Sequence, residues 1–178
     1  MSLFKNIAAD INAANRFSLS NKIIIFCFNR GFHALLWYRI SNRLYKWHIP
    51  VIPMIFTRLI QITYSIDIDY KAKLDGGIVI VHGVGLVIGS DVHIQSNVIL
   101  FHNVTLGRRG IGAVISPADG FPTVQKDCII CTGAVIIGKV VIGENTTIGA
   151  NCVITKDVAP NSICKLPEDH FITYKKNI

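Results

Sequence analysis

The chain carries few charges and no long uninterrupted hydrophobic run. Only 16% of its 178 residues are charged and 51% are hydrophobic, which excludes intrinsic disorder and allows a large buried core. The apolar stretch Ile23–Phe28 is six residues long, far short of the ~20 residues that a membrane-spanning helix needs. The N-terminus also lacks the basic, apolar and small-residue order of a secretory signal. We therefore expect a cytoplasmic protein of one main domain.

The cysteines are also too few and too irregular for a disulfide framework. There are five, an odd number, and three of them, Cys128, Cys131 and Cys152, lie where a small apolar side chain is wanted. Cys128 and Cys131 have the spacing of a zinc-ligand pair, but no second pair accompanies them. We expect reduced thiols in a protein core and no bound metal.

Acidic residues are almost missing from the first third of the chain. Residues 1–66 hold eight Lys or Arg and a single acid, Asp10, which gives +7, whereas the remaining residues sum to zero. Residues 31–47 have one apolar helical face, and Arg39, Arg43 and Lys46 recur on another face. That basic stripe is typical of a solvated helix surface, or of one attracted to anionic lipid or to a pyrophosphate-linked substrate. We predict that residues 1–65 form a helical cap.

An aliphatic residue recurs at every sixth position through most of the remaining chain. A period of six fits neither a helix nor a flat strand, but it is typical of a β-helix whose hexapeptides each contribute one short strand and a turn. Stacked coils then bury one continuous core. The repeat changes register by two residues after Ile80. Its positions are Ile68, Leu74, Ile80, Ile88, Ile94, Leu100, Leu106, Val124, Ile130, Ile136, Ile142, Ile148 and Ile154.

The repeat is interrupted once, between Gly107 and Val124. The intervening segment is rich in glycine and contains a proline, so it cannot continue the coil. A loop extruded from a regular scaffold usually carries binding groups. We therefore predict a β-helix over 66–160, a functional loop over 108–123 and a C-terminal tail over 161–178.

Two histidines interrupt otherwise apolar repeats. His82 and His102 both occupy the third position of their hexapeptide, which points outward. They are twenty residues apart, which is one coil of eighteen plus the two-residue slip, so we expect them to lie near each other. An exposed imidazole with a pKa near neutrality can accept a proton from a hydroxyl. For His102 a direct contact with substrate and a supporting surface position are equally compatible with the pattern.

These features resemble the left-handed β-helix acyltransferases, and in particular their serine acetyltransferase branch. The resemblance covers about residues 31–160 and rests on the hexapeptides, on residues 67–82 and on Val104-Thr105-Leu106-Gly107. It implies a mainly β fold, a left-handed parallel β-helix with a short helical cap and one extruded loop. It also implies that His82 is the general base and that Asp67, fifteen residues earlier, orients it. No metal is implied.

The resemblance further implies acetyl-CoA as the donor, bound in a groove between subunits of a homotrimer. Most of the matching donor-binding positions have small side chains, which let the extended thiol arm of acetyl-CoA approach the backbone. One position is basic and lies near the nucleotide end of acetyl-CoA. They are Thr132, Gly133, Ala134, Gly149, Ala150 and Lys156.

The sequence departs from serine acetyltransferases in ways that favour a different acceptor. Phe121 stands where that branch has a serine-binding histidine, and Val81 stands where it has an aspartate. The shorter cap and the segment around His102, Arg108 and Arg109 look more like the acetyltransferases of bacterial exopolysaccharide and capsule synthesis. We therefore expect a saccharide O-acetyltransferase whose acceptor is bound by His102, Arg108, Arg109 and Phe121. We also expect peripheral contact of the protein with the inner membrane face. The alternative acceptor is serine, in cysteine biosynthesis.

Two other functions are compatible with a β-helix. A γ-class carbonic anhydrase would hold zinc through three histidines, and His82, His93 and His102 are available, but His93 occupies a different hexapeptide position. A non-catalytic assembly scaffold would not explain paired histidines beside a glycine-rich loop. We expect no nucleic-acid partner.

Overall fold

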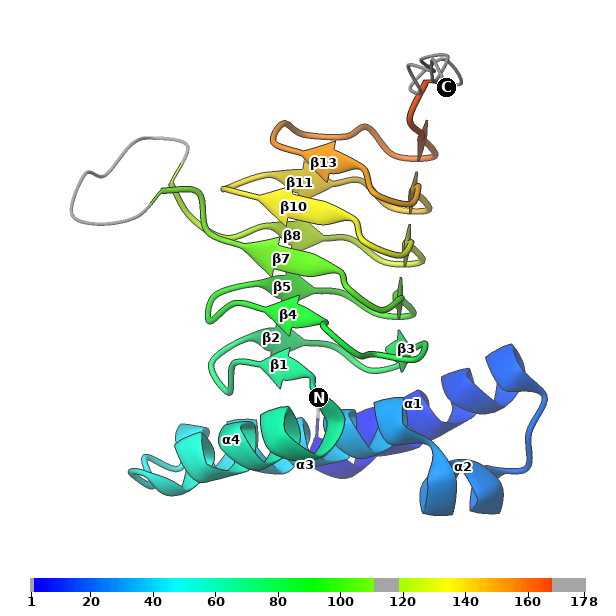
Figure 1. Ribbon diagram of the computed structural model, residues 1–178. Coiled ribbons are helices and arrows are strands. Elements are labelled where there is room, and N and C mark those ends of the chain that lie inside the picture. Colours follow the sequence, from blue (N-terminus) through cyan, green and yellow to red (C-terminus); the bar gives the residue numbers. More distant parts are fainter. Residues whose placement is uncertain (1, 111–118, 168–178) are drawn as a thin grey trace, which may run out of the picture.

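The chain forms a parallel β-helix that stands on a layer of helices (Figure 1). The computed structural model describes residues 2–110 and 119–167. The layer contains α1 (Leu3–Ser18), α2 (Lys22–Phe28), α3 (Arg30–Lys46) and α4 (Ile52–Tyr64). Short polar side chains begin the first three: the Ser2 hydroxyl accepts from Lys5 N, and the Asn21 and Asn29 side chains accept from Ile23 N and Phe32 N. Such caps satisfy backbone donors that a helix cannot satisfy itself.

The β-helix has three faces of parallel strands. Face I contains β1, β4, β7, β10 and β13; face II contains β2, β5, β8 and β11; face III contains β3, β6, β9, β12 and β14. The chain visits the faces in the order I, II, III, so each coil has three corners. The strands are β1 (Asp67–Ile68), β2 (Lys73–Leu74), β3 (Val79–Ile80), β4 (Val87–Ile88), β5 (His93–Ile94), β6 (Ile99–Leu100), β7 (Thr105–Gly107), β8 (Thr123–Val124), β9 (Ile129–Ile130), β10 (Val135–Ile137), β11 (Val141–Ile142), β12 (Thr147–Ile148), β13 (Val153–Ile154) and β14 (Ile163–Cys164).

The aliphatic residues of the hexapeptide repeat fill the inside of this prism. Almost all of them are fully buried in one cluster that runs the length of the stack, and only Ile154, in the last coil, is partly exposed. Side chains four positions later, such as Val92, Val98 and Cys128, point inward as well. Burial raises the pKa of the Cys128 thiol, so it remains protonated and behaves as a small apolar side chain. The hexapeptide prediction is confirmed.

The two-residue change of register lies in one corner. Asp67 pairs with Val87, twenty positions later, whereas Val87 pairs with Thr105, eighteen positions later. Because β2 and β3 also pair with partners twenty positions on, the extra residues fall between β3 and β4. The corner 81–86 therefore has six residues, whereas the next corner between the same two faces, 101–104, has four.

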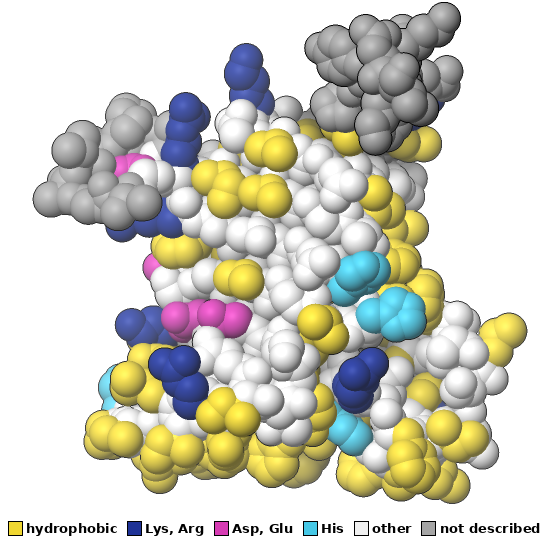
Figure 2. All heavy atoms as spheres, in the orientation of Figure 1, with side chains coloured by type: hydrophobic (Ala, Val, Ile, Leu, Met, Phe, Trp, Pro, Cys, Tyr) yellow, Lys and Arg dark blue, Asp and Glu magenta, His cyan; other side chains and the backbone are white. Residues whose placement is uncertain are grey.

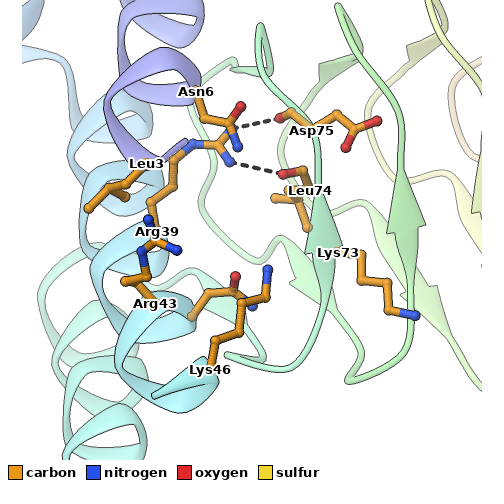
Figure 3. Close-up of a pocket in the computed structure, with 9 residues that line it drawn as sticks. Leu3, Asn6, Arg39, Arg43, Lys46, Lys73, Leu74 and Asp75 are labelled. Atoms are coloured by element: carbon orange, nitrogen blue, oxygen red, sulfur yellow. Dashed lines mark hydrogen bonds between the residues drawn. The ribbon is translucent and has the colours of Figure 1, made fainter. Parts of the chain in front are cut away.

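A buried ion pair joins the helical layer to the first coil. Arg39 of α3 and Asp10 of α1 are only 4% and 1% exposed, with Arg39 Nε 2.5 Å from Asp10 Oδ2. Arg39 also donates to the carbonyls of Leu74 (2.9 Å) and Asp75 (2.7 Å) (Figure 3). The prediction that Arg39 belongs to a solvated stripe is therefore wrong, because the guanidinium is the group that saturates the carbonyls at the end of β2.

The element boundaries differ from the predicted ones at two places. Strand β14 pairs with β12, so the β-helix continues to Cys164, beyond the predicted boundary at 160. The extruded loop leaves face I after Gly107 and the chain rejoins the stack with β8 at Thr123, which was predicted to be the last residue of the loop. Residues 111–118 of that loop and residues 168–178 of the predicted tail lie outside the described part of the chain.

Candidate active site

The corner that carries His82 is the longest corner between faces III and I. His82 has a positive φ of 63° and an exposed side chain, and Gly83 and Gly85, also at positive φ, follow closely. Gly85 has a φ of 73°, which favours glycine, and a β-carbon there would lie 2.1 Å from the side-chain oxygen Oδ1 of Asn103 in the next coil. The two extra residues and the two glycines together hold the imidazole out from the stack.

His82 and His102 lie beside each other, as the sequence predicted. Their ring centroids are 6.0 Å apart and the ring planes are inclined at 74°. The twenty-residue register of β3 and β6 places them at equivalent positions of successive coils. Thr132 follows in the next coil, with its Oγ1 3.5 Å from His102 Nδ1.

The corners between faces III and I in the following coils form a ladder of residues that are candidates for binding the donor. The backbone N–H of Gly133 donates to the His102 carbonyl at 3.1 Å, and the N–H of Asn151 donates to the Thr132 carbonyl at 2.9 Å. His82, His102, Thr132 and Ala150 therefore occupy equivalent positions in four successive coils. We call this corner the histidine edge. It also holds Gly149, and it brings together five of the six predicted donor-binding residues: Thr132, Gly133, Ala134, Gly149 and Ala150.

The sixth donor candidate and the predicted acceptor residues lie elsewhere in the same chain. Lys156 follows β13 and Arg108 follows β7, so both lie at the corner between faces I and II, which we call the loop edge. In Figure 1 the extruded loop leaves on the side opposite β3. Within one chain the width of face I separates Arg108, Arg109 and Phe121 from His82, so their role in binding the acceptor stays a prediction.

Phe121 has a packing role at the loop edge. It is half-buried against the core, and a β-carbon on Gly89 would lie 2.5 Å from its Cε1. Near it, the guanidinium of Arg108 lies 3.5 Å from the carboxylate of Asp119. A hollow of about 460 Å³ at this edge is lined by Asp91, Arg108, Asp119, Gly120, Phe121 and Lys139.

Asp67 lies in the coil that begins the histidine edge. It is half-buried on β1, and its neighbour Ser65 accepts a hydrogen bond from Gly85 N at 2.8 Å, which ties the start of β1 to the His82 corner. Among the described residues no hydrogen bond joins the Asp67 carboxylate to His82. The orienting role of Asp67 therefore stays a prediction.

A hollow beside His82 involves cap residues that the sequence analysis did not identify. Its volume is about 380 Å³, and β3 and His82 form one wall. The other wall comes from α1, α2 and the start of α3, with Phe17, Phe28 and Arg30 among its residues. In the sequence, the only sign that the cap approaches β3 here is Gly31. A β-carbon at this position would lie 2.3 Å from the Ile80 carbonyl oxygen. Only glycine lets α3 approach β3 this closely, which places Arg30 beside His82.

The three histidines considered for a carbonic anhydrase-like zinc site, which such enzymes form between subunits, lie on different parts of the described chain. His93 lies on β5 of face II, with its Nε2 3.8 Å from Asp75 Oδ2, whereas His82 and His102 lie at the histidine edge. Among residues 2–110 and 119–167, no three His, Cys, Asp or Glu side chains are grouped to hold a metal ion. A polar cavity of about 130 Å³ between the cap and β2, lined in part by Arg43, Lys46 and Lys73, lies on face II as well.

Comparison with known sequences supports one family. Residues 121–156 match the family model described as bacterial transferase hexapeptide (six repeats). A serine acetyltransferase of Helicobacter pylori is 33% identical over 142 residues, covering 80% of this chain and 81% of the relative. A putative serine acetyltransferase of Schizosaccharomyces pombe is 35% identical over 136 residues, covering 75% of this chain. The chain spans only about half (48%) of that longer relative.

Solved structures agree with this relationship. A serine acetyltransferase of Neisseria gonorrhoeae in complex with serine superposes with a TM-score of 0.82 at 27% identity, covering 90% of this chain and 65% of that one. A serine acetyltransferase in complex with CoA also gives 0.82 at 27% identity, covering 91% and 66%. The predicted left-handed β-helix with a helical cap is thereby confirmed.

These matches correct the predicted branch of the family. The relatives named above are serine acetyltransferases, and none supports the exopolysaccharide and capsule branch expected from the sequence. The Helicobacter pylori relative is matched over most of its own length. The chain therefore belongs to the serine acetyltransferase family of hexapeptide-repeat transferases.

Proposed function

We propose that the protein is an O-acetyltransferase that moves an acetyl group from acetyl-CoA to a hydroxyl, with His82 as the general base. The observation that carries the proposal is the placement of His82, exposed on a lengthened corner between a ladder of small residues and a hollow. His82 accepts the hydroxyl proton as the oxygen attacks the thioester carbonyl. When the tetrahedral intermediate collapses, the C–S bond breaks and the proton passes to the departing thiolate. Such base catalysis is worth ~10²–10⁴-fold.

The ladder above His82 supports acetyl-CoA as the donor. Thr132, Gly133 and Ala150 leave the backbone accessible along the histidine edge, and an extended pantetheine arm needs this close approach. The complex of a family member with CoA is consistent with the same donor. Lys156, at the loop edge, would meet the nucleotide end of the donor only if two chains share the site.

A trimer would bring the two edges together. The donor ladder and His82 lie at one end of face I, whereas Arg108, Phe121 and Lys156 lie at the other. In a closed ring of three chains, the histidine edge of one chain meets the loop edge of its neighbour. We propose this homotrimer as the functional unit, because it would bring the predicted site residues of two neighbouring chains into one groove.

Serine is the acceptor that the family favours. Apart from His82, the hollow beside the base has one charged lining residue, Arg30, and a guanidinium is well suited to a carboxylate. Phe121, which led us to expect a saccharide, packs at the loop edge of its own chain. We therefore propose a serine O-acetyltransferase, with Arg30 binding the serine carboxylate.

The experiment is acetyl-CoA turnover with L-serine and with a panel of sugars and oligosaccharides under identical conditions. We expect the highest kcat/KM for L-serine, and His82→Ala should lower kcat at least ~100-fold without unfolding the protein. His93→Ala, which removes an imidazole from face II, is the matched control and should keep wild-type turnover. A saccharide with kcat/KM well above that of serine would refute the acceptor. Normal turnover by folded His82→Ala would refute the base.

A further inference from the structure

The helical cap exposes apolar side chains on the side that faces away from the β-helix. Helix α4 buries Pro53 and Ile60, and Ile60 joins the core cluster of the stack. Its opposite side carries an exposed apolar stripe at helical spacing, and α2 adds a second group beside it. We call this surface the cap underside; its residues are Ile23, Ile24, Phe26, Ile52, Met54, Ile55, Leu59 and Ile62.

Figure 2 shows hydrophobic side chains gathered along the lower margin of the molecule, beneath the helices. Ile62 is 74% exposed and Ile23 is 71% exposed, so most of the surface of each side chain is open to solvent. Soluble monomers rarely expose apolar patches of more than a few hundred Å² unless the patch binds something. The cap underside therefore needs a partner.

The charge of the cap indicates what kind of partner this is. Residues 1–66 carry a net +7, and their single acid, Asp10, is buried in the pair with Arg39. Exposed cations are interleaved with the apolar side chains: Lys22 precedes Ile23, and Arg58 precedes Leu59. The partner surface must therefore be apolar and anionic together.

A second copy of the cap does not meet this requirement. Two undersides in contact would place basic residues against basic residues, with no exposed acid in either cap to pair with them. Like charges in contact cost several kcal/mol across an interface. A bilayer containing anionic phospholipid supplies both phosphate groups and an apolar interior.

We propose that the cap underside binds the surface of an anionic phospholipid bilayer. The apolar side chains of α2 and α4 enter the boundary between headgroups and acyl chains, and Lys22 and Arg58 pair with phosphates. Exposed aromatic side chains of the cap, such as Trp47, suit the headgroup level. No helix in the described residues is long and apolar enough to span a membrane, so the helices would lie in the plane of the interface.

This orientation has a consequence for the proposed active site. Phe28, the last residue of α2, lines the hollow beside His82, and the same short helix contributes Ile23, Ile24 and Phe26 to the cap underside. A bilayer bound at the cap underside would therefore lie next to the entrance of that hollow, with the β-helix directed away from the membrane (Figure 1). The inference does not depend on acetyl transfer, because the apolar and basic groups exist whatever the acceptor is.

Flotation of the full chain with lipid vesicles tests the proposal. We expect binding to vesicles of phosphatidylcholine with about one third phosphatidylglycerol, weaker binding to phosphatidylcholine alone, and release at high salt because counter-ions screen the basic residues. Ile62→Glu should weaken binding at least ~10-fold, because a carboxylate enters the apolar boundary. Ile163→Glu is the matched control: Ile163 is 76% exposed at the far end of the stack, and this variant should bind as wild type does.

Three outcomes would overturn the proposal. Wild-type protein that stays unbound with anionic vesicles refutes it directly. Equal loss of binding by Ile62→Glu and Ile163→Glu would show that the contact is not at the cap. Sedimentation of lipid-free protein as an assembly that Ile62→Glu dissociates would assign the underside to a second copy. Acetyl transfer measured without vesicles separates these results from a failure of the proposed function, and Ile62→Glu should retain it.

Discussion

Replacement of Arg39 by methionine should loosen the joint between the cap and the β-helix. The substitution leaves the Asp10 carboxylate, 1% exposed, without its cation, and leaves the carbonyls of Leu74 and Asp75 without donors. Two backbone N–H groups, of Gly77 and Ile78, still donate to Asp10 Oδ1 at 2.8 and 3.0 Å. They stabilise the carboxylate but cannot neutralise it. Breaking one partner of a buried pair typically costs about 3–5 kcal/mol.

The assay is unfolding followed by circular dichroism, by heat and by guanidinium chloride. A loss of about 4 kcal/mol lowers Tm by roughly 8–16 °C for a chain of this size. Arg43→Met is the matched control on the same helix, because among the described residues the Arg43 guanidinium has no ion pair and lies 5.6 Å from the centroid of the Trp47 ring. A cation–π contact of this kind is worth about 0.5–2 kcal/mol, so this variant should lose much less stability than Arg39→Met.

A double variant distinguishes an ion pair from two independent contributions. Asp10→Leu combined with Arg39→Met removes both charges, so its cost should be well below the sum of the two single costs. Strict additivity, or an Arg39→Met protein within about 1 kcal/mol of wild type, would refute our account of the joint.

Three further predictions concern the proposed active site. Asp67→Asn should lower kcat less than His82→Ala does, because it leaves the base in place; steady-state kinetics of both variants decide this. Arg30→Met should raise the KM for L-serine at least ~10-fold with little change in kcat, whereas Lys22→Met should not; a change confined to kcat would contradict a carboxylate contact. Sedimentation at micromolar concentration should give a trimer, and a fully active monomer would contradict the shared site.

The repeat made most of the β-helix predictable. An aliphatic side chain at every sixth position has no use except to fill the inside of stacked coils, and residues such as Ile88 and Leu106 are fully buried there. The same arithmetic placed His82 beside His102, because positions related by one coil must be neighbours. The two-residue slip and its place after Ile80 were both visible in the sequence, and the strand register confirms them.

The helical cap was predicted only in outline. Periodicity identified a helix over 31–47, yet it assigned Arg39 to a solvated face. A pattern of residue types does not show which charged side chain has a buried ion-pair partner. Asp10, twenty-nine positions away, forms that pair. Arg30 was missed for the same reason: it reaches the hollow beside His82 only through the close approach of Gly31 to β3.

The sequence by itself determined the stack, the aliphatic core and the exposed histidines, because each depends on contacts that repeat at a fixed interval along the chain. Only the tertiary structure decided which residues share an edge. Within one chain, Phe121 and His82 lie at opposite ends of face I. The structure also decided that the apolar side chains of α4 face two ways, one stripe into the stack and the other, ending at Ile62, into solvent. A helix with apolar residues on both sides does not reveal from its sequence which side the core will cover.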